Sequence, residues 1–156
     1  MKKINTKPAL AVLVLSSALL FTTSCSSDNA HSKEKKSNEV VDTLKEIGIG
    51  PITTTMELGA IDSTMAENGD KIYAAKCLVC HTMYDQVVGP ALANISKRRA
   101  PEWIMNQILN PTEMVEKDPI AKKLLEKYKA PMANLNLTKE EARAILEYFR
   151  KKDSQQ

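Results

Sequence analysis

The sequence is poor in the side chains that most often build large cores and metal sites. Its 156 residues include one Trp, four Tyr, two Phe, three Cys and two His. With 4% aromatic residues, a domain of this size gains little from large buried rings, and a bound group at its centre would remove that shortage. The composition permits such a group without requiring it.

The chain also has little excess charge of either sign outside its first segment. It contains 22 Lys plus Arg and 19 Asp plus Glu, and Lys2, Lys3 and Lys7 all precede residue 25. The remainder is therefore balanced, and a balanced chain has no general attraction for phosphate. This argues against nucleic acid as a partner.

Residues 1–24 are typical of a secretory signal peptide. The three lysines precede an apolar run from Ala9 to Phe21, which is shorter than the roughly 20 residues of a membrane-spanning helix. We expect this segment to be removed. An uncleaved anchor helix is the alternative.

Cys25 directly follows this segment and precedes Ser26, Ser27 and Asp28, a pattern that resembles a bacterial lipobox. Thr22 departs from that pattern, which usually has an aliphatic residue there. We expect Cys25 to be lipidated and to anchor the protein on the periplasmic side of a bacterial membrane, outside the cytoplasm. Ordinary cleavage would instead leave a free thiol.

Two segments separate this cysteine from the first expected helix. Residues 25–46 are rich in Ser, Asn, Lys and Glu and predict a flexible, disordered tether. Residues 47–62 contain helix-breaking Gly, Pro and Thr among scattered apolar side chains, and predict an extended strap on the domain. The sequence suggests no function for the strap.

Residues 63–152 predict an all-α domain of about four helices. Thr64 and Glu67 have capping-box spacing before a helix that runs to residue 76. Further helices are expected over residues 101–110, 119–128 and 138–149, the last with Thr138 and Glu141 as its capping box. No convincing alternating strand pattern occurs.

The motif C-x-x-C-H, formed by Cys77, Cys80 and His81, lies at the end of the first expected helix. This is the attachment pattern of a c-type haem. The two thiols form thioethers with one porphyrin, and the adjacent imidazole ligates its iron. One motif predicts one covalently bound haem c.

Other uses of these cysteines fit less well. A zinc site needs more ligands, and the only other Cys and His are Cys25 and His31, both in the tether. A thioredoxin-like pair is expected near a βαβ pattern, which the helical layout contradicts.

From about Thr64 to Lys152 the chain resembles class I monohaem cytochromes c. The resemblance rests on the haem motif, the segment Gly89-Pro90-Ala91-Leu92, the pair Pro131-Met132 and the closing helix, in that order. It implies that the carbonyl of Pro90 accepts a hydrogen bond from His81 and that Leu92 packs on the haem face. It also implies that Gly69 meets Tyr148 or Phe149 where the first and last helices cross.

The sixth iron ligand is expected to be a methionine or an open position, because the domain has no second histidine. Met132 follows a proline just before the closing helix, where the family places its ligand, and Met114 is the alternative. Asn134 and Asn136 are near enough in sequence to donate a hydrogen bond to the thioether, although turn formation also explains them.

His/Met ligation leaves no position for a small-molecule substrate and favours electron transfer over catalysis. We therefore expect a non-enzymatic single-electron carrier that serves redox partner proteins of a respiratory chain. A fixed haem subunit of a reductase or oxidase complex is the main alternative, and an open-site sensor or peroxidase is the other.

A basic cluster follows the G-P-x-L segment. Lys97, Arg98 and Arg99 are either a solvated surface, a steering patch for an acidic partner or, for either arginine, a partner of a haem propionate. Trp103 either donates its indole N–H to a propionate or is only a core residue. The sequence does not choose among these roles.

Overall fold

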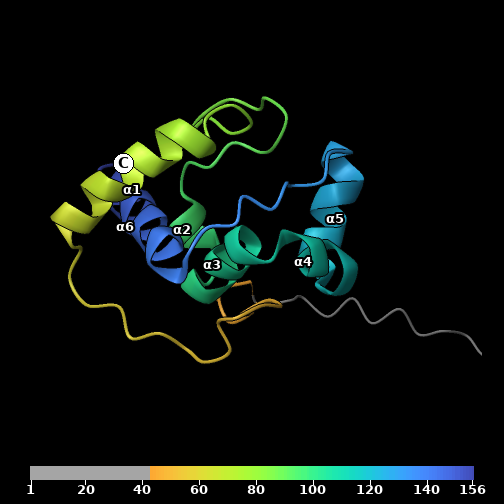
Figure 1. The fold of residues 1–156 in the computed structure, drawn as a ribbon, viewed down its shortest axis with the longest axis horizontal. Coiled ribbons are helices and arrows are strands. Elements are labelled where there is room, and N and C mark those ends of the chain that lie inside the picture. Colours follow the sequence, from red (N-terminus) through yellow and green to blue (C-terminus); the bar gives the residue numbers. More distant parts are fainter. Residues whose placement is uncertain (1–42) are drawn as a thin grey trace, which may run out of the picture. The chain divides into compact units, whose positions relative to one another are not determined.

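The computed structural model describes residues 43–156, so the signal segment, Cys25 and most of the predicted tether lie outside the described residues. Within that part the chain is all-helical and has no strands (Figure 1). Its helices are α1 (Ser63–Lys76), α2 (Ile95–Arg98), α3 (Pro101–Leu109), α4 (Pro111–Lys117), α5 (Pro119–Tyr128) and α6 (Lys139–Ser154). No described helix is both long and apolar enough to span a bilayer.

The predicted starts of α3, α5 and α6 are confirmed. Pro101 and Pro119 occupy the first turns of α3 and α5, and Thr138 and Glu141 form the capping box of α6. The predicted cap of α1 was wrong. Asp62 caps this helix by accepting the backbone N–H of Met65 at 2.9 Å.

Two short helices were not predicted. α2 has four residues and begins after Asn94, which adopts a left-handed conformation at φ 59°. α4 begins at Pro111, where only an end to helical structure was predicted. A proline in a first turn starts a helix as readily as it stops one, and α4 uses it in this way.

The crossing of α1 and α6 depends on Gly69. A Cβ at this position would lie 2.0 Å from the carbonyl oxygen of Ala144, so the two backbones touch. One turn further along α1, the ring of Tyr73 packs against Tyr148 and Phe149, at centroid distances of 5.0 and 5.9 Å. The glycine therefore meets the α6 backbone, and Tyr73 meets the two aromatic rings.

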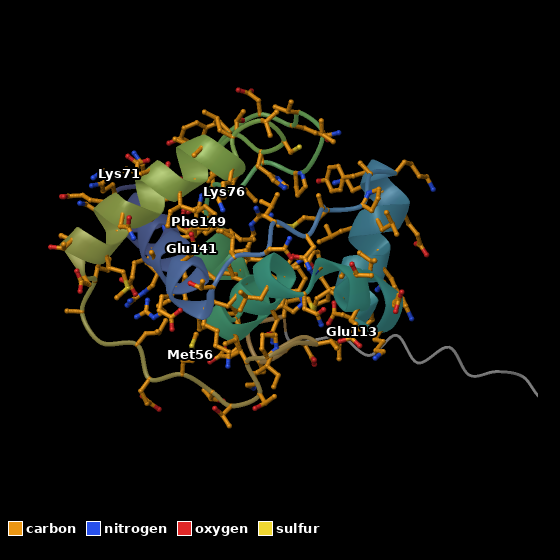
Figure 2. All side chains as sticks on the ribbon, viewed as in Figure 1. Met56, Lys71, Lys76, Glu113, Glu141 and Phe149 are labelled. Atoms are coloured by element: carbon orange, nitrogen blue, oxygen red, sulfur yellow. The ribbon has the colours of Figure 1, made fainter. Side chains whose placement is uncertain are left out.

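The segment from Ile47 to Asp62 contains no helix or strand; its first part lies along α3 and its last part runs to the start of α1 (Figure 1). The buried amide of Asn106 on α3 donates to the carbonyl oxygens of Ile47 and Ile52, at 2.8 and 2.9 Å. It also accepts the N–H of Ile52 at 2.9 Å. Met56, labelled in Figure 2, packs against the core from this segment. The strap thus takes these hydrogen bonds from a side-chain amide on a helix and not from a neighbouring strand.

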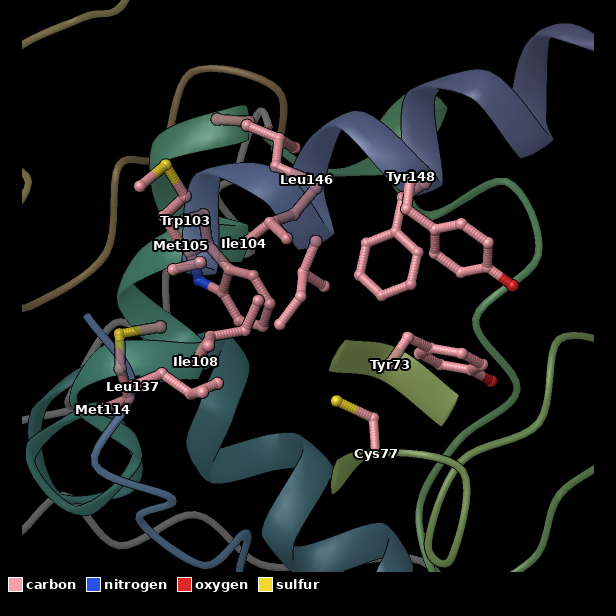
Figure 3. Packing of buried hydrophobic residues seen from close by; sticks show 14 of the residues in the cluster. Tyr73, Cys77, Trp103, Ile104, Met105, Ile108, Met114, Leu137, Leu146 and Tyr148 are labelled. Atoms are coloured by element: carbon pink, nitrogen blue, oxygen red, sulfur yellow. The ribbon is translucent and has the colours of Figure 1, made fainter. Parts of the chain in front are cut away.

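The core lies between α1, α3 and α6. In Figure 3, Trp103, Ile104, Ile108 and Leu146 fill its centre, and Cys77 lies at its edge below Tyr73. The haem motif therefore begins where the packed core ends.

Candidate haem site

The end of α1 sets the position of both motif cysteines. Cys77 caps α1, and its backbone N–H donates to the carbonyl of Tyr73 at 2.9 Å. The N–H groups of Cys80 and His81 then both donate to the carbonyl of Cys77, at 3.0 and 2.9 Å. This tight turn keeps the three reactive side chains together.

Both thiols are free of disulfides, Cys77 buried and Cys80 half-buried. Burial raises the pKa of the Cys77 thiol, Lys76 opposes this rise, and Cys80 adds to it. Burial therefore favours the neutral form of the Cys77 thiol.

The imidazole of His81 is oriented by the following loop. Its Nδ1 lies 3.0 Å from the carbonyl oxygen of Pro90, which only accepts, so the proton belongs on Nδ1. The opposite nitrogen, Nε2, is left without that proton and able to ligate a metal. This is the contact that the resemblance implied for Pro90.

Gly89 allows the loop to lie flat against the ring. A Cβ at this position would lie 2.2 Å from Cε1 and 2.7 Å from Nδ1 of His81. Its N–H also donates to the carbonyl of Cys80 at 2.9 Å. Only glycine therefore leaves room for the His81 ring at this position of the loop.

The rest of the loop folds back on itself. The N–H groups of Leu92 and Ala93 donate to the carbonyls of Thr82 and Met83, at 3.0 and 2.7 Å. Leu92 is half-buried and packs against the core. Several large apolar side chains around the motif are exposed, namely Leu78, Val79, Tyr84, Val87 and Val88.

Met132 lies in the non-helical segment between α5 and α6 and packs against the core. Its Sδ lies 3.7 Å from Nε2 of Gln107 on α3. Asn134 instead accepts the N–H of Asn136 at 2.9 Å, so this pair forms a turn. Gln107 was not predicted as a site residue; it interrupts the apolar run of α3, which marks a polar position but does not indicate Met132 as its partner.

The thioether of Met114, the alternative ligand, contacts the strap. It is fully buried, and its Sδ accepts the N–H of Ile49 in the strap at 3.0 Å. A Cβ on Gly48 would lie 2.9 Å from this sulfur. Met114 therefore anchors the strap.

The basic cluster divides into different environments. Lys97 and Arg98 are exposed, and Arg98 Nη2 donates to the carbonyl of Ala91 at 2.8 Å. Arg99 is half-buried 5.3 Å above the Trp103 ring, and its buried Nε has no partner among the described residues. Burial and, second, Arg98 lower the pKa of Arg99.

The indole N–H of Trp103 donates to Asp118 at 3.2 Å inside the core, so it is not available to a propionate.

These residues fit a covalently held haem. Two neighbouring thiols and an imidazole with a free Nε2 supply the groups for attachment and ligation. Among the described residues, no three His, Cys, Asp or Glu side chains gather into a site that could hold a bare metal ion. The arrangement is that of a c-type haem protein.

Comparison with known proteins gives the family. The sequence model of the cytochrome c family matches residues 66–152, and the chain belongs to this family. Its cofactor is a covalently attached haem c. No curated protein sequence matches the chain.

Solved structures agree with this assignment. A cytochrome c from Rhodothermus marinus is 39% identical, with a TM-score of 0.66, over 69% of this chain and 92% of that one. An engineered form of that protein, bound to a carbene intermediate, is also 39% identical, with a TM-score of 0.62, over 67% of this chain and 91% of the other. A cytochrome c domain of the pp3183 protein from Pseudomonas putida is 28% identical, with a TM-score of 0.50, over 55% and 88% of the two chains.

Proposed function

We propose that this chain is a single-electron carrier in which His81 and Met132 ligate the iron of its haem. The observation that carries the proposal is the oriented imidazole of His81, whose Nδ1 contacts Pro90 at 3.0 Å. Since His31 is the only other histidine and lies outside the domain, a thioether is the strongest remaining candidate for the opposite ligand.

The bound haem supplies a one-electron Fe(III)/Fe(II) couple. The chain's own residues attach the porphyrin through Cys77 and Cys80 and hold the His81 ring through Pro90. Arg99 offers its buried Nε to a propionate, and Arg98 offers an exposed charge nearby. Leu92 contributes an apolar contact on the His81 side.

An anaerobic potentiometric titration of the haem-loaded full chain tests this function. We expect a single transition that follows the Nernst equation for one electron, and a reduced spectrum that does not change under carbon monoxide. Rapid carbon monoxide binding would contradict the carrier function and favour an open-site sensor or peroxidase.

We further propose that the carrier works at the periplasmic face of a bacterial membrane, held there by a lipid on Cys25. The support is the sequence of residues 1–28, together with a haem that is attached outside the cytoplasm. Wild-type protein should partition into detergent and incorporate labelled fatty acid, whereas Cys25→Ser should do neither. Equal partitioning of the two would overturn lipidation.

The main alternative is a fixed subunit of a respiratory reductase or oxidase complex. A carrier meets its partner through a small, transient interface, whereas a subunit remains bound. Purification in high salt distinguishes the carrier from the subunit, because only a subunit should co-purify with its complex.

A further inference from the structure

Two consecutive side chains on α3 face different parts of the molecule. Asn106 is fully buried and makes three hydrogen bonds to Ile47 and Ile52 of the strap. Gln107 places its Nε2 at 3.7 Å from the Sδ of Met132. One turn of helix therefore contacts both the strap and the proposed iron ligand.

The amide of Gln107 suits a thioether partner. Sulfur in methionine only accepts hydrogen bonds, so Nε2 rather than Oε1 belongs beside it. The Oε1 atom is buried and has no partner within the described residues, so the amide makes its polar contact on the Met132 side alone. This fixes the direction of the contact.

Within residues 43–156, neither Asn134 nor Asn136 donates a hydrogen bond to the Met132 sulfur. The Asn134 side chain accepts the backbone N–H of Asn136 at 2.9 Å, which closes a turn. Gln107 is the donor that the structure places at the sulfur.

We propose that Gln107 is a positioning residue for the Met132 thioether and that the strap, through Asn106, holds the helix that carries it. This inference rests on the proposed ligation by Met132. An N–H donated to the sulfur withdraws electron density from it, so the thioether donates less to ferric iron and the reduced state is favoured. Gln107 thereby raises the reduction potential.

Gly50 connects the strap to this arrangement. A Cβ on Gly50 would lie 2.5 Å from Oδ1 and 2.9 Å from Cγ of Asn106. Gly50→Ala therefore displaces the Asn106 amide or the strap, since the three atoms nearest to the new Cβ all belong to Asn106. This substitution therefore disturbs α3 on the side that contacts the strap.

The first test compares Gln107→Leu with Asn134→Ala in haem-loaded full chains. Gln107→Leu should lower the reduction potential and move the ε-methyl proton signal of Met132 in the reduced protein, while the sulfur-to-iron charge-transfer band persists. Asn134→Ala should leave the potential unchanged. In the wild type, the side-chain amide protons of Gln107 should show an Overhauser contact to that methyl group.

The outcomes separate the two proposals. If the wild type lacks the charge-transfer band, ligation by Met132 fails and the role of Gln107 fails with it. If the band is present but Gln107→Leu keeps both the potential and the methyl signal, the role of Gln107 is overturned while the ligation stands.

The strap is tested by a double-mutant cycle. Gly50→Ala should lower the potential in the wild-type background and have no further effect in Gln107→Leu, because the donor is already gone. An equal shift in both backgrounds, or no shift in the wild type, would overturn the part of the proposal that assigns the strap this role.

Discussion

At the scale of single residues, the His81 ring is held by close contacts, with the Pro90 carbonyl 3.0 Å from its Nδ1 and Gly89 directly against its Cε1. The motif and the ring contact of Pro90 follow from sequence and family resemblance, because they are set by residues close together in the chain. The contact between Gln107 and Met132 joins residues 25 positions apart, and no local pattern encodes it. The same is true of Met114, whose sulfur meets a strap residue 65 positions away.

Gly89→Ala should impair haem attachment. Its new methyl group would overlap the His81 ring, where a Cβ lies 2.2 Å from Cε1. Either the ring or the loop must move, at a cost of about 1–3 kcal/mol. We expect a lower ratio of haem to protein in cells that mature c-type haem, measured by the absorbance of the purified chain.

Gly59→Ala is the matched control for this prediction, because nothing lies within 4 Å of a Cβ at that position. It should load haem as the wild type does. Full loading of Gly89→Ala would show that the loop yields easily and that the ring is not held as described.

At the scale of helices, prediction from the sequence is confirmed where a helix carries its own signals. The capping box of α6 and the prolines of α3 and α5 are local, and these helices begin where predicted. It was wrong at α1, because Asp62 competes with Thr64 as a cap and a pattern cannot rank the two. It missed α4, because Asn110 both ends α3 and precedes α4.

The contact between α1 and α6 predicts a pH dependence of stability. Burial and, next, the nearby Asp70 raise the pKa of Tyr148 to about 12. An unfolded tyrosine loses its proton near pH 10, so the folded chain binds more protons between these values. The stabilisation is complete below pH 10 and is lost as the pH rises toward 12.

Tyr148→Phe should therefore flatten the fall in the free energy of unfolding between pH 10 and 12. The difference from the wild type should be about 1–3 kcal/mol, measured by denaturant titration at each pH. Tyr128→Phe, on α5, removes a tyrosine that is not among the groups that raise the pKa of Tyr148, and it should follow the wild-type curve. A Tyr148→Phe curve parallel to the wild type would contradict the burial of this hydroxyl.

At the scale of the whole molecule, the strap and the domain form one hydrogen-bonded unit. Arg150 near the end of α6 donates to the carbonyl of Gly59 at 2.7 Å, and Asp62 donates its N–H to buried Glu147 at 3.2 Å. The sequence predicted that the strap lies on the domain, but its partners are long-range polar side chains that periodicity does not reveal.

A mobile carrier should show salt-dependent encounters with its partner. If Lys97 and Arg98 steer an acidic partner, the reduction rate of the protein by source membranes should fall as ionic strength rises. Changing both to Glu should slow the reaction at low salt by about tenfold, since steering raises association rates on that order or more. Stopped-flow absorbance measures this rate.

Lys139→Glu, at the start of α6, is the control for this charge reversal and should retain the wild-type rate. Equal rates for all variants at every salt concentration would contradict steering by the basic cluster. The exposed apolar side chains around the haem motif would then be the better candidate for the contact surface.

The most direct measurement of the central claim is the absorption of the oxidised protein in the weak sulfur-to-iron charge-transfer region, for the wild type, Met132→Ala and Met114→Ala. We predict that the wild type and Met114→Ala show the band and that Met132→Ala loses it, has a lower potential and binds carbon monoxide when reduced. If the band survives in Met132→Ala and disappears in Met114→Ala, the assigned ligand is wrong. If the wild type itself lacks the band and binds carbon monoxide, the claim of a six-coordinate electron carrier is contradicted.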